Sequence, residues 1–139
     1  MAGVNHLAYL LNRANRRLRA DAGRPASLPD LNPAQARILD VIPDGGCRIV
    51  DLSGELRVSK QGLGQLVGQL AAGGFVVVDN DAGDRRAKIV RRTPAGDEVV
   101  RAIRALLVEV EARWRAEVGP ERFAVFRSVL VDLVAGAGD

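Results

Sequence analysis

The sequence has one cysteine, Cys47, and one histidine, His6. One cysteine excludes an intramolecular disulfide and a zinc site built from several cysteines, and with a single histidine no transition-metal site is expected. Neither a Ser/His/Asp set nor a Cys/His pair with metal spacing is present, so little acid–base machinery remains. Asp79, Asp81 and Asp84 are interleaved with basic residues and lack the fixed spacing of a calcium loop. The sequence therefore predicts no enzyme, no metal and no cofactor.

Long hydrophobic runs are also missing, so no membrane span and no membrane partner are expected. The first residues, MAGVNHLAYLLNRANRRLR, carry their charges after the apolar part, the reverse of a secretory signal. We therefore expect a cytoplasmic protein. Lysine is scarce, and almost all of the basic charge comes from arginine, with a formal net charge of +3. Arginine binds phosphates and base edges in a forked geometry, so this charge permits a nucleic-acid partner without requiring one.

Apolar residues recur at spacings of three and four along most of the chain, which predicts a mainly α-helical protein. The predicted helices lie at Val4–Ala20, 33 to about 42, Val50–Arg57, about 59–72, 94 to about 118, and after Gly119-Pro120. Two segments, FVVVD and RAKIVRR, flank a polar turn and predict a small antiparallel β-hairpin. This order predicts a winged helix-turn-helix at 31–94, with a recognition helix at about 59–72 and a wing at about 75–92. The apolar faces of the other helices predict a helical dimerisation region formed by both termini, 1–30 and 95–139.

The stretch SKQGLGQLVGQLAAGG raises an alternative, because Gly62, Gly64 and Gly68 approach the spacing of a dinucleotide-binding loop. Such a loop must join a buried strand to a helix within a βαβ unit, and the spacing after the second glycine is one residue too long. The apolar residues at 63, 66, 67 and 70 instead follow one face of a helix. The sequence thus favours a helix that begins after an N-cap at Ser59.

The outward face of that helix predicts contacts with DNA. Gln61 and Gln65 can each bond an adenine edge with a donor and an acceptor, and the glycines allow a backbone to approach closely. Arg57 and Lys60 can meet phosphates, since 57–78 contains no acidic residue. The alternative is a poorly formed surface helix, because each interior glycine costs ~1 kcal/mol relative to alanine.

The predicted wing concentrates positive charge at a narrow tip. Arg85, Arg86 and Lys88 crowd this tip, and Asp84 can hold one guanidinium in place. An arginine there can enter an A·T-rich minor groove, where the potential is most negative. The alternative is a solvated hairpin whose charges only protect its edge from aggregation.

The sequence resembles the multiple-antibiotic-resistance regulator (MarR) family over nearly its whole length. The resemblance depends on the spacing of Gly74-Phe75-Val76, Asp84-Arg85-Arg86 and Thr93-Pro94-Ala95-Gly96, and on Val58-Ser59-Lys60-Gln61. It implies a homodimer whose recognition helices enter successive major grooves of double-stranded DNA, with Arg86 as the wing-tip arginine and Asp84 as its orienting partner. Arg92 stands where the family usually has leucine, and Ala82 replaces a common proline.

The resemblance also implies a possible effector, a small aromatic acid or another lipophilic anion. His6, Tyr9 and Arg13 on the first helix are the candidate ligand-binding residues. Cys47 could be reactive if the adjacent Arg48 lowers its pKa, although a buried inert cysteine is the alternative. The function we expect is that of a DNA-binding transcriptional regulator, a homodimeric repressor of a pseudo-palindromic operator. The rival is a winged-helix protein-interaction module without sequence-specific DNA binding.

Overall fold

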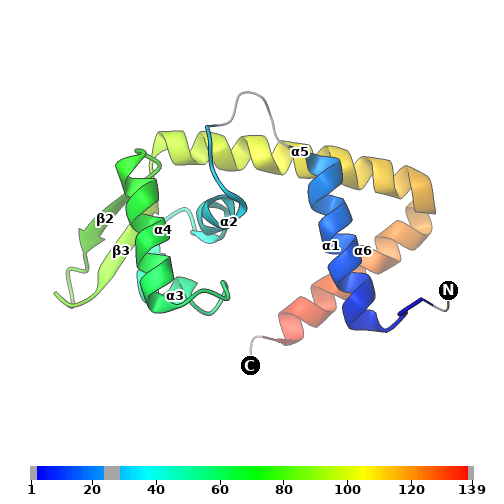
Figure 1. Cartoon of the computed structure of the whole chain (residues 1–139), viewed down its shortest axis with the longest axis horizontal. Coiled ribbons are helices and arrows are strands. Elements are labelled where there is room, and N and C mark those ends of the chain that lie inside the picture. Colours follow the sequence, from blue (N-terminus) through cyan, green and yellow to red (C-terminus); the bar gives the residue numbers. More distant parts are fainter. Residues whose placement is uncertain (1–2, 24–28, 138–139) are drawn as a thin grey trace. The chain divides into compact units, whose positions relative to one another are not determined.

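The computed structural model describes residues 3–23 and 29–137, and it is mainly helical with one small antiparallel sheet, as predicted (Figure 1). In chain order the elements are α1 (Leu7–Ala22), α2 (Pro33–Val41), β1 (Cys47–Arg48), α3 (Ile49–Leu52), α4 (Lys60–Ala72), β2 (Val76–Asn80), β3 (Lys88–Arg92), α5 (Pro94–Val118) and α6 (Pro120–Gly136). They divide into two compact units, one of Pro25–Ile103 and one of Met1–Arg24 with Arg104–Asp139, and the boundary falls within α5. None of the helices in the described ranges is long and apolar enough to cross a membrane.

The predicted starts of α2 and α4 are confirmed by side-chain caps, whereas α1 begins at Leu7, after an N-cap at His6, and not at the predicted Val4. Asn32 Oδ1 accepts a hydrogen bond from the backbone N–H of Gln35 at 2.8 Å, and Gln35 Oε1 accepts one from the Asn32 backbone at 2.9 Å. Ser59 Oγ accepts the backbone N–H of Gly62 at 3.0 Å, so α4 begins where the sequence places it. Such caps satisfy backbone donors that the first helical turn leaves without partners.

The sheet differs from the predicted two-stranded hairpin, because β1 adds a third strand in the order β1-β3-β2. Cys47 pairs with Val90 and Arg48 pairs with Ile89, directly after a turn that ends at Gly46 with φ +81°. Two residues are too few to show a strand period, so the sequence could not distinguish β1 from a loop. The helix predicted at Val50–Arg57 is also shorter, since α3 ends at Leu52.

The core of the Pro25–Ile103 unit is aliphatic, and α4 is at its centre. In this unit α4 contacts α2, α3 and β2 (Figure 1). The buried residues come from the helices of the unit, from β2 and β3, and from the segments beside them: Ile38, Leu39, Ile42, Leu52, Leu56, Leu63, Val67, Leu70, Val76, Val90, Val99 and Val100. Burial of so many aliphatic side chains stabilises the unit chiefly through the hydrophobic effect.

Two of the segments that resemble the MarR family, Gly74-Phe75-Val76 and Thr93-Pro94-Ala95-Gly96, meet at one structural junction. Gly74, with φ +83°, ends α4, and the N–H of Phe75 bonds the carbonyl of Leu70 at 2.9 Å, as in a Schellman motif. Thr93 Oγ1 donates to the carbonyl of Gly74 at 2.6 Å and accepts the N–H of Gly96 at 3.2 Å. A Cβ at Gly96 would lie 2.2 Å from the Phe75 carbonyl oxygen. These residues therefore join α4, β2 and α5 rather than contact a ligand.

Arg92, which departs from the family pattern, is a partly buried structural residue whose side chain is only 6% exposed. Its guanidinium donates to the carbonyls of Leu39, at 2.9 Å, and Ile42 at the end of α2. It also pairs with Asp44 at 2.7 Å and with Asp97, in the first turn of α5, at 2.8 Å. Arg92 thus connects the end of α2 to the start of α5.

The second unit consists of α1, the C-terminal part of α5, and α6. Arg17 pairs with Glu117 and stacks on Trp114, with its Cζ 5.3 Å from the ring centroid. The indole N–H of Trp114 donates to Asp21 at 2.8 Å, and Phe123 is buried. Many apolar side chains of this unit remain exposed, and α1 and α6 supply most of them.

Candidate nucleic-acid interface

One face of α4 is exposed and carries the residues that the sequence assigns to DNA. Leu63, Val67 and Leu70 point into the core. The exposed side consists of Lys60, Gln61, Gly64, Gln65 and Gly68, and Arg57 precedes the helix. Within the described ranges no interaction occupies the side chains of Arg57, Lys60, Gln61 and Gln65. The helical period therefore leaves both charges and both amides available for a partner.

Two of the three glycines on α4 have no packing reason among the residues that the structure describes. A Cβ added at Gly64 or Gly68 would meet nothing within 4 Å. At Gly62 the added atom would lie 2.9 Å from Val58 Cγ1 and 3.1 Å from Ser59 Oγ, so the capped first turn crowds this position. The structure thus explains Gly62 and leaves an open, side-chain-free strip at Gly64 and Gly68.

Gln69 is exposed on the same helix, but its amide is already engaged. Gln35 Nε2 donates to Gln69 Oε1 at 2.9 Å, and Gln35 also caps α2. This contact joins two helices whose residues are 34 positions apart. Gln69 is therefore engaged within the protein, whereas the amides of Gln61 and Gln65 have no partner in the described ranges.

The turn between β2 and β3 is ordered by two aspartates. Asp81 Oδ1 accepts the N–H of Gly83 at 3.0 Å, and Asp84 Oδ1 accepts the backbone N–H of Arg86 at 2.9 Å. Asp84 therefore orients the backbone of the turn, and no guanidinium among the described residues pairs with it, which corrects the expected side-chain pairing. The pKa of Asp81 is lowered, first by the hydrogen bond from Gly83 and then by the guanidinium of Arg48.

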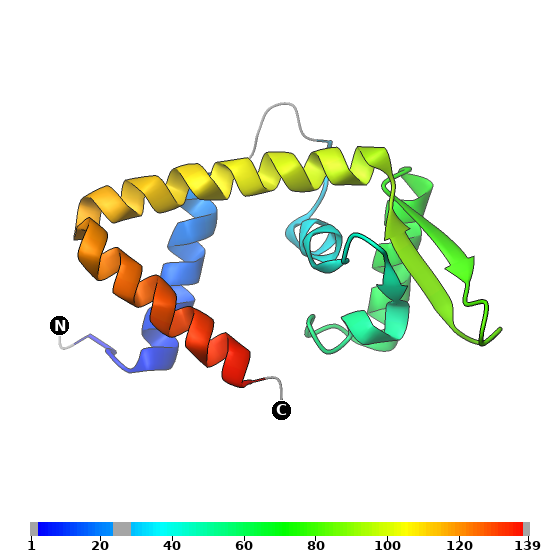
Figure 2. The same cartoon turned by 180° about the vertical axis from the view of Figure 1, so that it is seen from behind.

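The basic side chains of the wing fall into two groups. Lys88 Nζ donates to Asn80 Oδ1 at 2.6 Å, across the paired strands. The exposed guanidinium groups of Arg85 and Arg86 have no partner among residues 3–23 and 29–137. In Figures 1 and 2 the tip of the hairpin and the N-terminal end of α4 lie at the same end of this unit. The structure thus brings the candidate phosphate contacts and base-reading residues to one end of the winged helix.

The candidate ligand-binding residues on α1 are not gathered in one pocket. His6 is the N-cap of α1, and its Nδ1 accepts the backbone N–H of Tyr9 at 3.2 Å. Arg13 lies over the Tyr9 ring, with its Cζ 5.9 Å from the centroid. Of these three residues, Arg13 alone lines the cavity described next.

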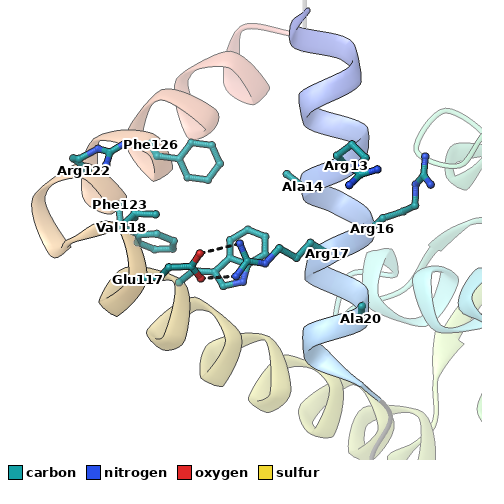
Figure 3. A pocket seen from close by; sticks show the side chains of 11 residues that line it. Arg13, Ala14, Arg16, Arg17, Ala20, Glu117, Val118, Arg122, Phe123 and Phe126 are labelled. Carbon is teal, nitrogen blue, oxygen red and sulfur yellow. Dashed lines mark hydrogen bonds and ion pairs between the residues drawn. The ribbon is translucent and has the colours of Figure 1, made fainter. Parts of the chain in front are cut away.

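An open cavity of about 750 Å³ lies between α1 and the α5–α6 corner of the second unit (Figure 3). Figure 3 shows Phe126 projecting from α6 toward α1, whereas Arg16 extends away from α6. The lining includes Arg13, Arg16, Arg17, Trp114, Glu117, Arg122, Phe123 and Phe126. The α5 and α6 members were not predicted, because nothing local in the sequence indicates that they face α1.

Cys47 lies in β1 and is partly buried. Its pKa is raised, mainly by burial and further by the charge of Asp51. Arg48 is directed to Asp81 and does not lower this pKa. The environment of Cys47 is therefore that of an unreactive thiol.

Comparison with known proteins identifies relatives of the fold. The MarR family model matches residues 30–87. No curated protein sequence matches the chain. Among solved structures, transcriptional regulator Tm0710 from Thermotoga maritima is 25% identical, with a TM-score of 0.65, and the match covers 92% of this chain and 91% of that one.

Two further relatives share the fold at lower identity. Apo MarR from E. coli is 19% identical, with a TM-score of 0.78 and coverage of 94% of this chain and 98% of that one. MepR of S. aureus in complex with DNA is 18% identical, with a TM-score of 0.73 and coverage of 96% and 99%. MepR bound to ethidium bromide is also 18% identical, with a TM-score of 0.62 and coverage of 96% and 97%. The resemblance seen in the sequence is therefore confirmed: the MarR family model matches the winged-helix part of the chain, and the fold is similar to solved structures of MarR-family transcriptional regulators.

Proposed function

We propose that the protein is a homodimeric repressor that reads a pseudo-palindromic operator through α4 and the wing. The observation that carries the proposal is the combination, in one unit, of an acid-free exposed face on α4 with the guanidinium groups of Arg85 and Arg86, which no other residue of the described ranges pairs with. Gln61 and Gln65 read base edges in the major groove, and Arg86 enters the minor groove. The phosphate contacts come from Arg57, Lys60, Arg85 and Lys88. Ser59 and Asp84 act by ordering the backbone of the two reading elements.

The proposed homodimer forms through α1 and α6. Their exposed apolar side chains are Leu7, Leu10 and Leu11 on α1, and Val125, Phe126, Val129, Val131, Leu133 and Val134 on α6. Apolar surface of this extent on one unit is typical of an interface. A twofold dimer presents two winged helices, which match the two half-sites of a pseudo-palindrome.

Substitution in this apolar face tests the dimer. Leu133 is 63% exposed in the single chain, so arginine can replace it without disturbing the core of that chain. We expect Leu133→Arg to be monomeric in sedimentation velocity. Val77→Arg, at a position 47% exposed on β2, is the matched control and should leave the dimer intact. A dimeric Leu133→Arg would contradict the assignment of the interface to α6.

A small aromatic or lipophilic anion is the proposed effector, and the cavity of the second unit is its proposed site. Arg17 already pairs with Glu117, whereas Arg13 contacts only the Tyr9 ring within the described ranges. Arg13 is thus the proposed partner of a carboxylate, with Phe123 and Phe126 beside the apolar part. Such a ligand releases DNA only if it binds more tightly to a dimer whose two winged helices are arranged unsuitably for DNA than to the DNA-binding arrangement. Titration with salicylate, observed by Trp114 fluorescence, tests this site, and Arg13→Ala should weaken the response.

The wing assignment is tested by removal of one guanidinium. We expect Arg86→Ala to weaken binding across DNA sequences in a mobility-shift titration, using fragments selected from genomic DNA by the purified protein. Arg19→Ala, which removes the same charge from the other unit, is the control for net charge. Gln65→Ala should instead relax preference at one base position, by ~1–3 kcal/mol. Unchanged affinity in Arg86→Ala would contradict the wing assignment.

The rival function is a winged-helix protein-interaction module without sequence-specific DNA binding. The glycine-rich α4 and the modest net charge favour it. Salt dependence separates the two functions, because binding through several phosphates weakens steeply as the salt concentration rises. A mainly apolar protein interface lacks this dependence. If the selected fragments contain no enriched inverted repeat, the rival is favoured.

A further inference from the structure

An ion pair joins β1 to the start of the wing turn. Arg48 Nε donates to Asp81 Oδ2 at 2.9 Å, and Arg48 Nη2 lies 2.6 Å from the same oxygen. The other carboxylate oxygen, Oδ1, accepts the N–H of Gly83. The Asp81 side chain is 18% exposed and that of Arg48 is 48% exposed. Both oxygens of Asp81 are thus occupied within the protein, so this carboxylate is not a free negative charge on the wing.

The register of the sheet explains why these two residues meet. Arg48 on β1 is opposite Ile89 on β3, and Ile89 is opposite Asp79 on β2. Asp81 comes two residues after Asp79, at the position where an extended chain presents the same face. The Arg48 side chain therefore lies on the face that Asp81 shares, and the pair spans the sheet from one edge strand to the end of the other.

The turn that carries Arg85 and Arg86 is built on Asp81. The N–H of Asp81 bonds the carbonyl of Ala87 at 3.0 Å, which closes the base of the turn. The carbonyl of Asp81 accepts the N–H of Asp84 at 3.3 Å, and Asp84 in turn accepts the backbone N–H of Arg86. A side-chain contact that holds Asp81 thus also holds the backbone that presents Arg86.

We propose that Arg48 is a positioning residue for DNA binding, which fixes the wing through Asp81 so that Arg86 is presented at a constant offset from α4. Arg48 is also the N-cap residue of α3, so the pair connects the wing turn to the helical part of the unit. A wing that is ordered before binding loses less conformational freedom on the DNA, and this raises affinity. The inference rests on the proposed DNA-binding function.

A double-mutant cycle distinguishes positioning from direct contact. Arg48→Gln removes the ion pair, and Arg86→Ala removes the side chain that the pair is proposed to position. Affinity is measured by fluorescence anisotropy with a labelled double-stranded fragment that the wild-type protein selects from genomic DNA. We expect Arg48→Gln to weaken binding by roughly three- to tenfold in the wild-type background and to have almost no effect in the Arg86→Ala background. An equal loss in both backgrounds would overturn the proposal, because it would mean that Arg48 contacts a phosphate itself.

Asp81→Asn provides a second test that does not depend on loss of a positive charge. The amide oxygen of asparagine can still accept the N–H of Gly83, while the ion pair with Arg48 is lost. Removing an acidic residue beside DNA should strengthen binding if only net charge matters. If Arg48 positions the wing, Asp81→Asn should instead weaken binding, by about the same factor as Arg48→Gln does. Arg48→Lys should bind DNA more tightly than Arg48→Gln. Asp81→Asn that binds as tightly as wild type, or more tightly, would refute the inference.

Failure of this inference is distinguishable from failure of the proposed function. If wild-type protein selects no DNA, the proposed function is wrong, and so is the role of Arg48 in DNA binding. If wild-type protein binds and Arg86→Ala weakens it, while Arg48→Gln leaves affinity unchanged, the wing assignment stands and only the positioning role is wrong. Thermal unfolding of each variant shows whether a loss of affinity comes from a loss of folding.

Discussion

Replacing Gly64 and Gly68 with alanine distinguishes two effects of glycine on α4: a loss of helix stability and a closer approach of DNA. Both residues lie within the helix, and a methyl group at either position meets no atom within 4 Å. Alanine loses less backbone entropy on folding than glycine, so each substitution should stabilise the free protein by roughly 0.4–1 kcal/mol. For the double variant we expect the free energy of unfolding to rise by about 1–2 kcal/mol and the melting temperature to rise by roughly 3–8 °C.

Close approach of DNA predicts the opposite effect on binding. The two methyl groups would stand on the exposed face that carries Gln61 and Gln65, where they would hold the helix backbone away from the groove. We expect the double variant to bind the selected fragment at least about tenfold more weakly, which corresponds to ~1.4 kcal/mol. Thermal unfolding and fluorescence anisotropy on the same samples measure both quantities.

Gly62→Ala is the matched control on the same helix. Its methyl group would lie 2.9 Å from Val58 Cγ1, so we expect no stabilisation there. If the Gly64 and Gly68 variants gain stability and keep their affinity, close approach is refuted. Tighter binding would also refute it, and would mean that the glycines weaken a helix that DNA must complete.

Three further predictions concern other parts of the chain. Arg92→Ala should lower the free energy of unfolding, measured in urea, by about 2–4 kcal/mol, because two carbonyls at the end of α2 lose their donor, at ~1–3 kcal/mol each. The control Arg91→Ala breaks one exposed ion pair and should lower it by less than ~1 kcal/mol. Cys47 should react with a thiol reagent at pH 8 more slowly in the folded than in the urea-unfolded protein, because its raised pKa lowers the thiolate fraction; equal rates would contradict this environment. The pKa of Asp21 is lowered chiefly by the hydrogen bond from Trp114, so its contribution to stability is complete above its unfolded pKa of about 3.9 and is lost as the pH falls through the lowered folded pKa. Trp114 emission, from the single tryptophan, should follow that transition, and Asp21→Asn should abolish it.

Local features of the fold were predictable because their signals lie within a few residues of one another. A cap and the turn that it satisfies are three residues apart, as for Asn32 with Gln35 and Ser59 with Gly62. The apolar period of α4 repeats every three or four residues, so the sequence by itself favours a helix over a dinucleotide loop. The sequence thus determined which segments are helices, where α2 and α4 begin, and that Gln61 and Gln65 share an exposed face.

Contacts between distant residues were decided by the tertiary structure alone. Arg48 meets Asp81 from 33 positions away, and Arg92 reaches the Leu39 carbonyl from 53 positions away. Neither separation leaves a local pattern, since each contact depends on how the sheet and helices pack. For the same reason the sequence suggested Asp84 as the partner of a guanidinium, although its nearest donor is a backbone N–H. Sequence determined the α4 helix and the wing, and packing decided how they are held, because the partners of a side chain depend on the path of the whole backbone.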